Sequence, residues 1–376
     1  MSRKQRVLIV GSSPLMLLEA LHQQRLGNDV RIVDGADIVG GAWREMSLFG
    51  LRRIEIAPHV IMYNRSTYDY FAKDIGLKMT KMTPSPKYVW MNRFGSIWIP
   101  YVISPFLAYF TVPLHYIKNP QYRANFRYIR EEYFGRLKDG AGLFFKYLFT
   151  WPKPAIEYPA GGTLELLDRI EEDVAEAGLD VDFNKKVESI EKVESGELAV
   201  DISGERYQFD KVFLTRHQSI PRIAHCGKEF PTGYSPYHYT SVHLLLKTLG
   251  LPKASFCLAK GDDIINLVSD LTSYMDDVPE GLRVVTVRFH YGADVKDREG
   301  AERIVSRLIE LEYFNRGTEL QDFHFSSFEQ GRMLHDCVTE IEQSFGDSLE
   351  IFKSTSFPNS ISDRISLWRE SAGKSK

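Results

Sequence analysis

The sequence has few cysteines and none of the short motifs that mark metal or nucleophile catalysis. Its three cysteines, Cys226, Cys257 and Cys337, are far apart and form no CxxC pair, which argues against a disulfide framework and a zinc site. HExxH, GxSxG and P-loop sequences are absent, and the ten histidines show no metal-ligand spacing. We therefore expect no bound metal and a reducing, cytoplasmic location.

An excess of charge of one sign is also missing. The 47 Lys and Arg residues nearly balance 50 Asp and Glu residues, so nothing predicts a nucleic-acid partner, and we expect a small-molecule substrate. The apolar run Val7–Val10 ends at Gly11 and is too short for a signal peptide. Residues 97–117 have the length of a membrane-spanning helix but contain three prolines. We interpret them as a buried or cavity-lining segment, with shallow membrane contact as the alternative.

The first 34 residues predict a strand, a glycine turn, a helix and a second strand. The apolar strand 6–10 is followed by a turn where the dinucleotide fingerprint GxGxxG belongs, with Ser13 and Met16 at the second and third glycine positions. The first glycine permits a tight turn, and a helix N-terminus offers N–H groups to a pyrophosphate. An acid about 20 residues further on accepts hydrogen bonds from ribose hydroxyls. The predicted dinucleotide contacts are Gly11, Ser12, Ser13, Pro14, Leu15 and Asp34; the alternative is a βαβ unit whose nucleotide site has decayed.

The rest of the chain alternates between helical and strand patterns. We expect an irregular, glycine-rich segment over 35–60, a hairpin over 87–100 and a series of strands within 180–215. Further strands are expected at 237–247, 284–290 and 349–353, and helices at 66–76, 163–178, 299–313, 328–344 and from about Asn359.

Several short motifs together resemble one flavoprotein superfamily. A Gly40-Gly41 pair follows Asp34 by six residues, Ala57-Pro58-His59 follows later, and Tyr158-Pro-Ala-Gly-Gly162 precedes a helix. Residues 209–215 end in a D-x-V-x-x-T strand. In this order of motifs the sequence resembles the FAD-dependent amine oxidase, protoporphyrinogen oxidase and UDP-galactopyranose mutase superfamily.

The resemblance implies non-covalently bound FAD and a set of contacts. Gly40, Gly41, Ala42, Trp43 and Arg44 would lie along the pyrophosphate, and Val187 and Thr215 near the cofactor. Pro58 and His59 would lie near the flavin ring, which makes His59 the candidate catalytic residue. The family has a Gly-Asp pair after its last strand, but this chain has Lys353 and Ser354 there. A helix start containing Asn359, Ser360 and Ile361 would still direct N–H groups at the flavin.

Each candidate also has a plainer interpretation. Gly40-Gly41 fits a flexible turn, and His59 fits an ordinary hydrogen-bonded histidine. Arg123 and Arg127 share a helical face that could bind an anionic substrate or simply be solvated. Tyr237 and Tyr239 could line a substrate pocket or belong to a plain strand.

The fold expected from these features is α/β: a doubly wound, Rossmann-like FAD-binding domain of discontinuous segments with an inserted α+β substrate domain. The FAD-binding domain would comprise residues 1–80, 158–225 and 345–376, and the substrate domain residues 81–157 and 226–344. The expected function is an FAD-dependent oxidoreductase that transfers a hydride from a small organic substrate to flavin.

Three alternatives remain open at the level of sequence. A mutase-like flavoenzyme would act on a sugar nucleotide without net redox, but Met62 stands where the mutases have a second histidine. A non-catalytic protein could retain the fold with substituted motifs. A plain NAD(P)-dependent dehydrogenase is the third, although we find no organisation for a second cofactor domain.

Overall fold

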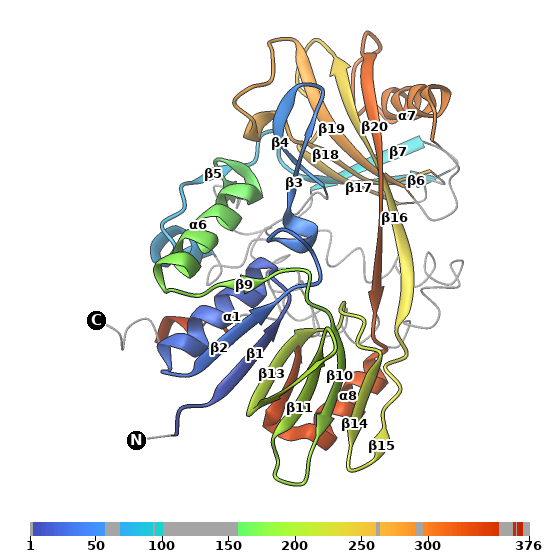
Figure 1. Ribbon diagram of the computed structural model, residues 1–376. Helices are drawn as coiled ribbons and strands as arrows, with labels where there is room; N and C mark the ends of the chain where they lie inside the picture. Colours follow the sequence, from blue (N-terminus) through green and yellow to red (C-terminus); the bar gives the residue numbers. More distant parts are fainter. Residues whose placement is uncertain are drawn as a thin grey trace, which may run out of the picture.

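The computed structural model describes residues 3–56, 68–92, 95–100, 157–260, 264–289, 296–352, 364–365 and 367–370. The lower part in Figure 1 is built on a five-stranded parallel sheet of order β21-β13-β1-β2-β9. Its strands come from separated segments of the chain: β1 (Arg6–Val10), β2 (Asp29–Val33), β9 (Val181–Asp182), β13 (Lys211–Thr215) and β21 (Leu349–Phe352). The predicted discontinuous Rossmann-like core is therefore confirmed.

Two helices cover one face of this sheet, α1 (Pro14–Arg25) and α6 (Gly162–Glu176). Alternate strand residues such as Ile9 and Phe213 are fully buried against α1 and α6 side chains such as Leu17 and Ile170. Helix α1 starts with a proline, whose fixed φ suits the first helical turn. Because α1 follows β1 after a short turn, its N-terminus lies at the carboxyl ends of the central strands.

The opposite face is covered by a second sheet, which is where the structure differs from a doubly wound arrangement. This mixed sheet has the order β12-β11-β10-β14-β15. Its bounds are β10 (Val187–Lys192), β11 (Leu198–Ile202), β12 (Glu205–Phe209), β14 (Arg222–His225) and β15 (Lys228–Glu229), and α8 (His335–Phe345) packs beside it. Leu8 and Val10 of β1 are buried against this layer, so the central strand is apolar on both faces.

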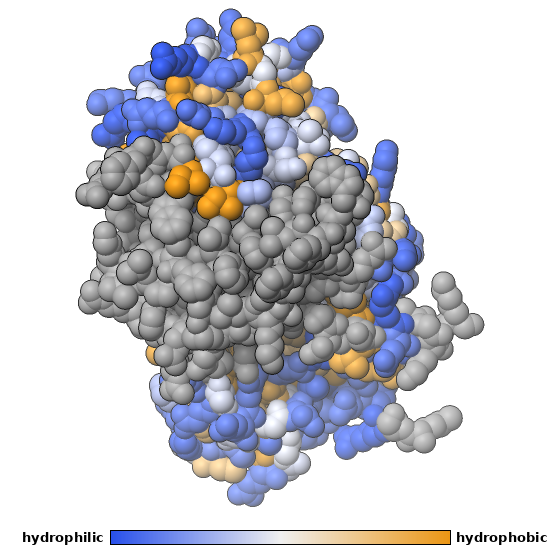
Figure 2. All heavy atoms as spheres, turned by 180° about the vertical axis from the view of Figure 1, so that it is seen from behind, coloured by the Kyte–Doolittle hydropathy of each residue, from blue (hydrophilic) through white to orange (hydrophobic). Residues whose placement is uncertain are grey.

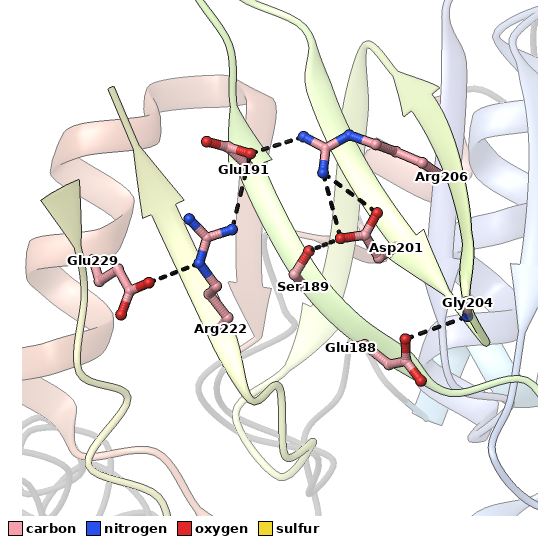
Figure 3. Close-up of polar contacts among 8 residues, drawn as sticks. All are labelled: Glu188, Ser189, Glu191, Asp201, Gly204, Arg206, Arg222 and Glu229. Carbon is pink, nitrogen blue, oxygen red and sulfur yellow. Dashed lines mark hydrogen bonds and ion pairs between the residues drawn. The ribbon is translucent and has the colours of Figure 1, made fainter. Parts of the chain in front are cut away.

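The other face of the second sheet carries a network of ion pairs (Figure 3). Arg206 lies 2.7 Å from Glu191 and 3.4 Å from Asp201, and Arg222 lies 2.7 Å from Glu229.

Because half of the Arg206 side chain is exposed, solvent screens its interactions. We predict that Arg206→Ala lowers the free energy of unfolding by less than about 1 kcal/mol in urea titrations. A loss of several kcal/mol would contradict this account.

The upper part in Figure 1 contains a seven-stranded mixed sheet of order β20-β16-β19-β18-β17-β6-β7. All neighbours are antiparallel except β17 and β6. The bounds are β6 (Lys87–Asn92), β7 (Gly95–Pro100), β16 (Ser235–Lys247), β17 (Phe256–Lys260), β18 (Ile265–Asp270), β19 (Leu282–Phe289) and β20 (Glu319–Arg332). Helix α7 (Arg298–Glu310) packs Ile304 and Leu308 on one face. The long strands β16 and β20 extend down toward the five-stranded sheet (Figure 1).

Smaller elements connect the two parts. Strands β3 (Glu45–Leu48) and β4 (Leu51–Glu55) form a hairpin whose Leu51 and Ile54 pack against Val284 of β19. The expectation of an irregular segment over 35–60 is therefore wrong for 45–55. The remaining elements are the strands β5 (Met79–Lys81) and β8 (Glu157–Pro159), the π-helix η2 (Tyr70–Asp74) and three short 3-10 helices, η1 (Gly41–Trp43), η4 (Thr272–Tyr274) and η5 (Gly346–Ser348).

The prediction of a helix over 328–344 is also partly wrong. Residues 328–332 continue β20, where Phe328 pairs with Tyr239 and Arg332 with Ser235, and α8 begins only at His335. Strand β16 determines this outcome, because pairing with a distant strand overrides the local helical pattern. The other expected elements with described residues agree with the structure in type. The domain boundaries themselves stay a prediction.

Within the described segments, no helix combines the length and the apolar character required to cross a bilayer. Seen from behind, the coloured residues are mostly hydrophilic at the top and bottom, with small separate hydrophobic groups (Figure 2). Of the segment 97–117, residues 97–100 form part of β7, and the rest lies outside the described residues.

Candidate cofactor site

The turn after β1 has the geometry expected of the first glycine of a dinucleotide fingerprint. Gly11 has φ +99°, a conformation that side chains disfavour, and its N–H donates to Val33 O at 2.7 Å. The turn leads directly into α1, whose N-cap residue Ser13 makes no side-chain capping bond. The N-terminal turn of α1 therefore lies at the carboxyl ends of β1 and β2, where open α/β sheets bind ligands.

Asp34 follows β2 and organises this turn. Its Oδ2 accepts from Ser12 N–H at 2.7 Å and from Ser12 Oγ at 2.5 Å, while Oδ1 accepts from Ala36 N–H at 2.9 Å. The Asp34 carbonyl accepts from Lys185 N–H at 2.9 Å, close to Val187. The carboxylate thus holds the turn in place, and each oxygen has a second lone pair, so Oδ1 retains capacity for a ribose hydroxyl.

The Gly40-Gly41 pair is packed onto the same turn. Gly40 N–H donates to Ser12 O at 3.1 Å, and Gly40 O accepts from Trp43 N–H at 2.9 Å. Gly40 has φ +103°, and a Cβ there would lie 2.7 Å from Leu167 Cδ2 of α6. A side chain is therefore excluded both by the backbone conformation and by the helix.

Two polar groups at this turn lack partners among the residues that the structure describes. The Ser13 Oγ atom is buried without a hydrogen bond. The half-buried Arg44 guanidinium, just beyond η1, forms no ion pair or hydrogen bond with any part of the chain that the structure describes. A pyrophosphate would satisfy a hydroxyl donor, a guanidinium and a helix N-terminus together. The residues present therefore fit the phosphate groups of a dinucleotide.

Two further predicted residues lie at the edge of this site. Val187 begins β10 and is buried in one cluster with Val10 and Val33. Thr215 ends β13, beside β1, and its N–H donates to Gln218 Oε1 at 2.7 Å. The structure thus brings together the predicted contacts Gly11, Ser12, Ser13, Pro14, Leu15, Asp34, Gly40, Gly41, Ala42, Trp43, Arg44, Val187 and Thr215. Whether each one contacts a cofactor stays a prediction.

The other predicted residues fall into two groups, those in a described strand and those that the structure does not describe. Tyr237 and Tyr239 belong to β16, opposite Gln330 and Phe328, as the strand interpretation expects. Pro58, His59, Arg123, Arg127, Asn359, Ser360 and Ile361 lie outside the described residues.

Sequence reasoning missed a buried carboxylate at the start of α6. Glu55 ends β4 and accepts from Tyr158 OH and from Thr163 N–H, both at 3.0 Å, and from Thr163 Oγ1. Burial, and then the neighbouring Glu55, raise the pKa of Tyr158 well above its usual value. The carboxylate thus caps α6 and fixes the residues that immediately precede the Ala57-Pro58-His59 segment.

A second buried carboxylate, Asp270, lies in the upper sheet, where the sequence suggests a strand before it but gives it no role. Asp270, 1% exposed, forms a 2.6 Å ion pair with Arg283 and accepts from Thr272 N–H at 3.1 Å. Burial raises the pKa of Asp270, against the opposing effect of Arg283. No sequence signal linked these residues, because carboxylates such as Glu55 and Asp270 find their partners only through the tertiary fold.

Two histidines, the half-buried His217 and the buried His243, have lowered pKa values. Burial, helped by Arg332 and Arg216, lowers the pKa of His217 to about 3, and its Nδ1 donates to Gly331 O at 3.0 Å. Burial, and then His324, lower the pKa of His243 to about 4. His243 lies 2.9 Å from Thr286 Oγ1 and 3.1 Å from Ser326 Oγ. Within the described ranges, no cluster of His, Cys, Asp and Glu is arranged for a metal ion.

The neutral state of His243 predicts a pH-dependent stability. As the pH falls from 6.5 to about 4, the unfolded chain binds a proton at this histidine that the folded protein does not. Stability should therefore fall over this window, by at most about 3 kcal/mol from this residue. His243→Gln keeps hydrogen-bonding groups without titrating. Urea titrations at both ends of the window should show the wild type losing more stability than the variant; parallel losses would contradict the account.

Comparisons with known proteins found a family match over part of the chain and solved structures of similar fold. Residues 104–222 match the family model described as flavin containing amine oxidoreductase. No curated protein matches the chain. The fold is similar to that of a protein from an Exiguobacterium species assigned as a protoporphyrinogen oxidase, with 14% identity, TM-score 0.63 and full coverage of both chains.

Two further solved structures share the fold. Putrescine oxidase has 14% identity and TM-score 0.62, with 99% of each chain covered. Reduced UDP-galactopyranose mutase has 12% identity and TM-score 0.60, with 92% of this chain and 89% of the other covered. At these identities the likeness shows the fold, and the family match adds the flavin. Over residues 104–222 the chain is therefore similar to the flavin containing amine oxidoreductases, and it shares its fold with solved oxidoreductases.

Proposed function

We propose that this flavin-dependent oxidoreductase transfers a hydride from a C–N or C–C bond of a small organic substrate to FAD bound at the Gly11–Arg44 turn. The observation that carries the proposal is the convergence of three phosphate-binding features at one place. These are the uncapped N-terminus of α1 and two side chains without a partner among the described residues, the Ser13 hydroxyl and the Arg44 guanidinium. FAD supplies the redox chemistry when it is bound.

The chain's own groups would bind and orient the cofactor. Arg44 and the N–H groups of α1 would neutralise the pyrophosphate. Asp34 would accept from a ribose hydroxyl, while Ser12 keeps its carboxylate fixed. Glu55, through α6, would position the β4 end that leads to His59, which remains our candidate catalytic residue.

The first experiment is an absorption spectrum of the purified protein, followed by heat release and chromatography of any chromophore. We expect the flavin absorption bands and release of one FAD per chain. A colourless protein that also fails to bind added FAD would overturn the proposal and leave a protein that keeps the fold without the cofactor.

The substrate class is then tested by anaerobic reduction. Bleaching of the flavin by an amine such as putrescine, or by protoporphyrinogen, would support hydride transfer. The alternative is a mutase-like reaction without net redox. It is kept because the fold is also similar to that of UDP-galactopyranose mutase. Isomerisation of UDP-galactopyranose by the chemically reduced protein, without bleaching of the oxidised protein by any donor, would replace our proposal with that alternative.

A further inference from the structure

A single glutamine side chain closes the gap between β1 and β13 at the edge of the candidate site. The backbone ladder between these strands ends at the pair Ile9 and Phe213. Beyond it, the Gln218 carboxamide accepts from Thr215 N–H at 2.7 Å and donates through Nε2 to Val10 O. One carboxamide that both donates and accepts reproduces the hydrogen bonding of a backbone peptide group. The Gln218 side chain therefore continues the hydrogen bonding between β1 and β13 past the last backbone pair.

A tight turn brings this side chain back to the strand end. Gln218 N–H donates to Thr215 O at 3.1 Å, the bond that closes a four-residue turn. Thr215 and Val10 are both buried, so their polar backbone groups need partners within the protein. Gln218 supplies a partner to each of them.

The same side chain lies directly against the glycine turn. A Cβ at Gly11 would overlap the Gln218 amide nitrogen, so Gly11 must lack a side chain for this contact as well as for its φ of +99°. Gly11 N–H bonds to Val33 O on the other side. Strand β1 lies between β2 and β13 in the sheet. The turn that follows β1 lies between β2 and the Gln218 side chain, which takes the place of β13 there. This is the point where the strand order reverses and where such sheets bind ligands.

We propose that Gln218 is a positioning residue for the cofactor: its side-chain hydrogen bonds to Val10 and Thr215 set the Gly11–Ser13 turn and the α1 N-terminus where they bind the FAD pyrophosphate. The proposal rests on the proposed function. Gln218 acts through the turn and takes no part in hydride transfer.

The test uses Gln218→Glu, which changes one donor into an acceptor. Ionised, the new side chain accepts from Thr215 N–H but cannot donate to Val10 O; protonated, it can donate again. The pKa of a glutamate is about 4.3 in water and rises beside a carbonyl oxygen. We therefore expect FAD to bind about tenfold more weakly than to the wild type at about pH 8, and the ratio of dissociation constants to approach one at about pH 5.

Two further variants complete the test. Gln24→Glu is the matched control, because Gln24 Nε2 donates to Ala177 O at the far end of α1 and should leave FAD affinity unchanged. Gln218→Met fills the same space without either hydrogen bond and should weaken binding at both pH values without recovery. It also carries the test if Gln218→Glu does not fold. FAD titration by fluorescence, with thermal denaturation of the FAD-free chains, measures all four proteins.

The outcomes separate the two proposals. If the wild type binds FAD and the Gln218 variants bind it equally well at both pH values, Gln218 has at most a structural role and this inference is overturned. If Gln218→Glu loses affinity without recovering at low pH, the donor to Val10 O is not the operative group, which also overturns it. A wild type that binds no FAD would overturn the proposed function itself.

Discussion

Arg44→Ala is expected to weaken FAD binding by about ten- to hundredfold while leaving the fold intact. A hydrogen bond to a charged group contributes about 1.5–3 kcal/mol, and each 1.4 kcal/mol is tenfold in affinity. The Arg44 guanidinium has no partner among the described residues, so its removal breaks no contact there within the protein. The free energy of unfolding of the FAD-free chain should therefore change by no more than about 0.5 kcal/mol.

The measurement is a fluorescence titration with FAD at two salt concentrations. Arg44→Ala should also reduce the salt dependence of binding, because one cation at the phosphates is lost. Arg52→Ala is a suitable control, since Arg52 is an exposed arginine of the neighbouring β4 strand. Equal dissociation constants for Arg44→Ala and the wild type would show that the phosphates do not lie at this turn.

Glu19→Ala is expected to lower the free energy of unfolding by about 3–5 kcal/mol, the cost of breaking a buried charge pair from one side. The Glu19 side chain in α1 is fully buried. It accepts from Gln23 Nε2 at 2.7 Å and from Trp368 Nε1 at 3.0 Å, and it lies 3.7 Å from Arg364 Nη1. The carboxylate therefore links Arg364 and Trp368, near the end of the chain, to the helix that also forms the candidate site.

The pattern of losses among related variants tests this network. Glu19→Gln keeps an acceptor for the Trp368 indole and should lose less than Glu19→Ala. Trp368→Ala should cost about 3–5 kcal/mol through the cavity it leaves, because the indole is fully buried and packs 5.9 Å from the Tyr70 ring. Urea titrations of these variants and of Arg206→Ala compare the loss of unfolding free energy at a buried charge with the loss at an exposed one. A Glu19→Ala loss as small as that of Arg206→Ala would contradict the network.

The N-terminal unit could be predicted from sequence because its signals are local. An apolar strand, Gly11 and an acid at the right spacing specify a βαβ turn without reference to distant residues. The resemblance predicted Gly40 beside the pyrophosphate, but its hydrogen bond to Ser12 and its close packing on Leu167, in a helix more than 100 residues away, were not predicted.

The parts that sequence reasoning missed depend on long-range contacts. Gln218 bonds to Val10 across 208 positions, and Glu55 bonds to Thr163 across 108. A buried glutamate or glutamine has the same local pattern as an exposed one, so only the fold reveals its partners. The error at 328–332 has the same origin, since β16 supplies the pairing that makes this segment a strand.

The most direct test of the central claim is a crystal structure of the FAD-loaded protein. We predict the pyrophosphate within hydrogen-bonding distance of Ser13 Oγ, the first N–H groups of α1 and the Arg44 guanidinium, with Gln218 still bonded to Val10 O and Thr215 N–H. FAD bound elsewhere, with the Gly11–Ser13 turn free of phosphate, would contradict this account.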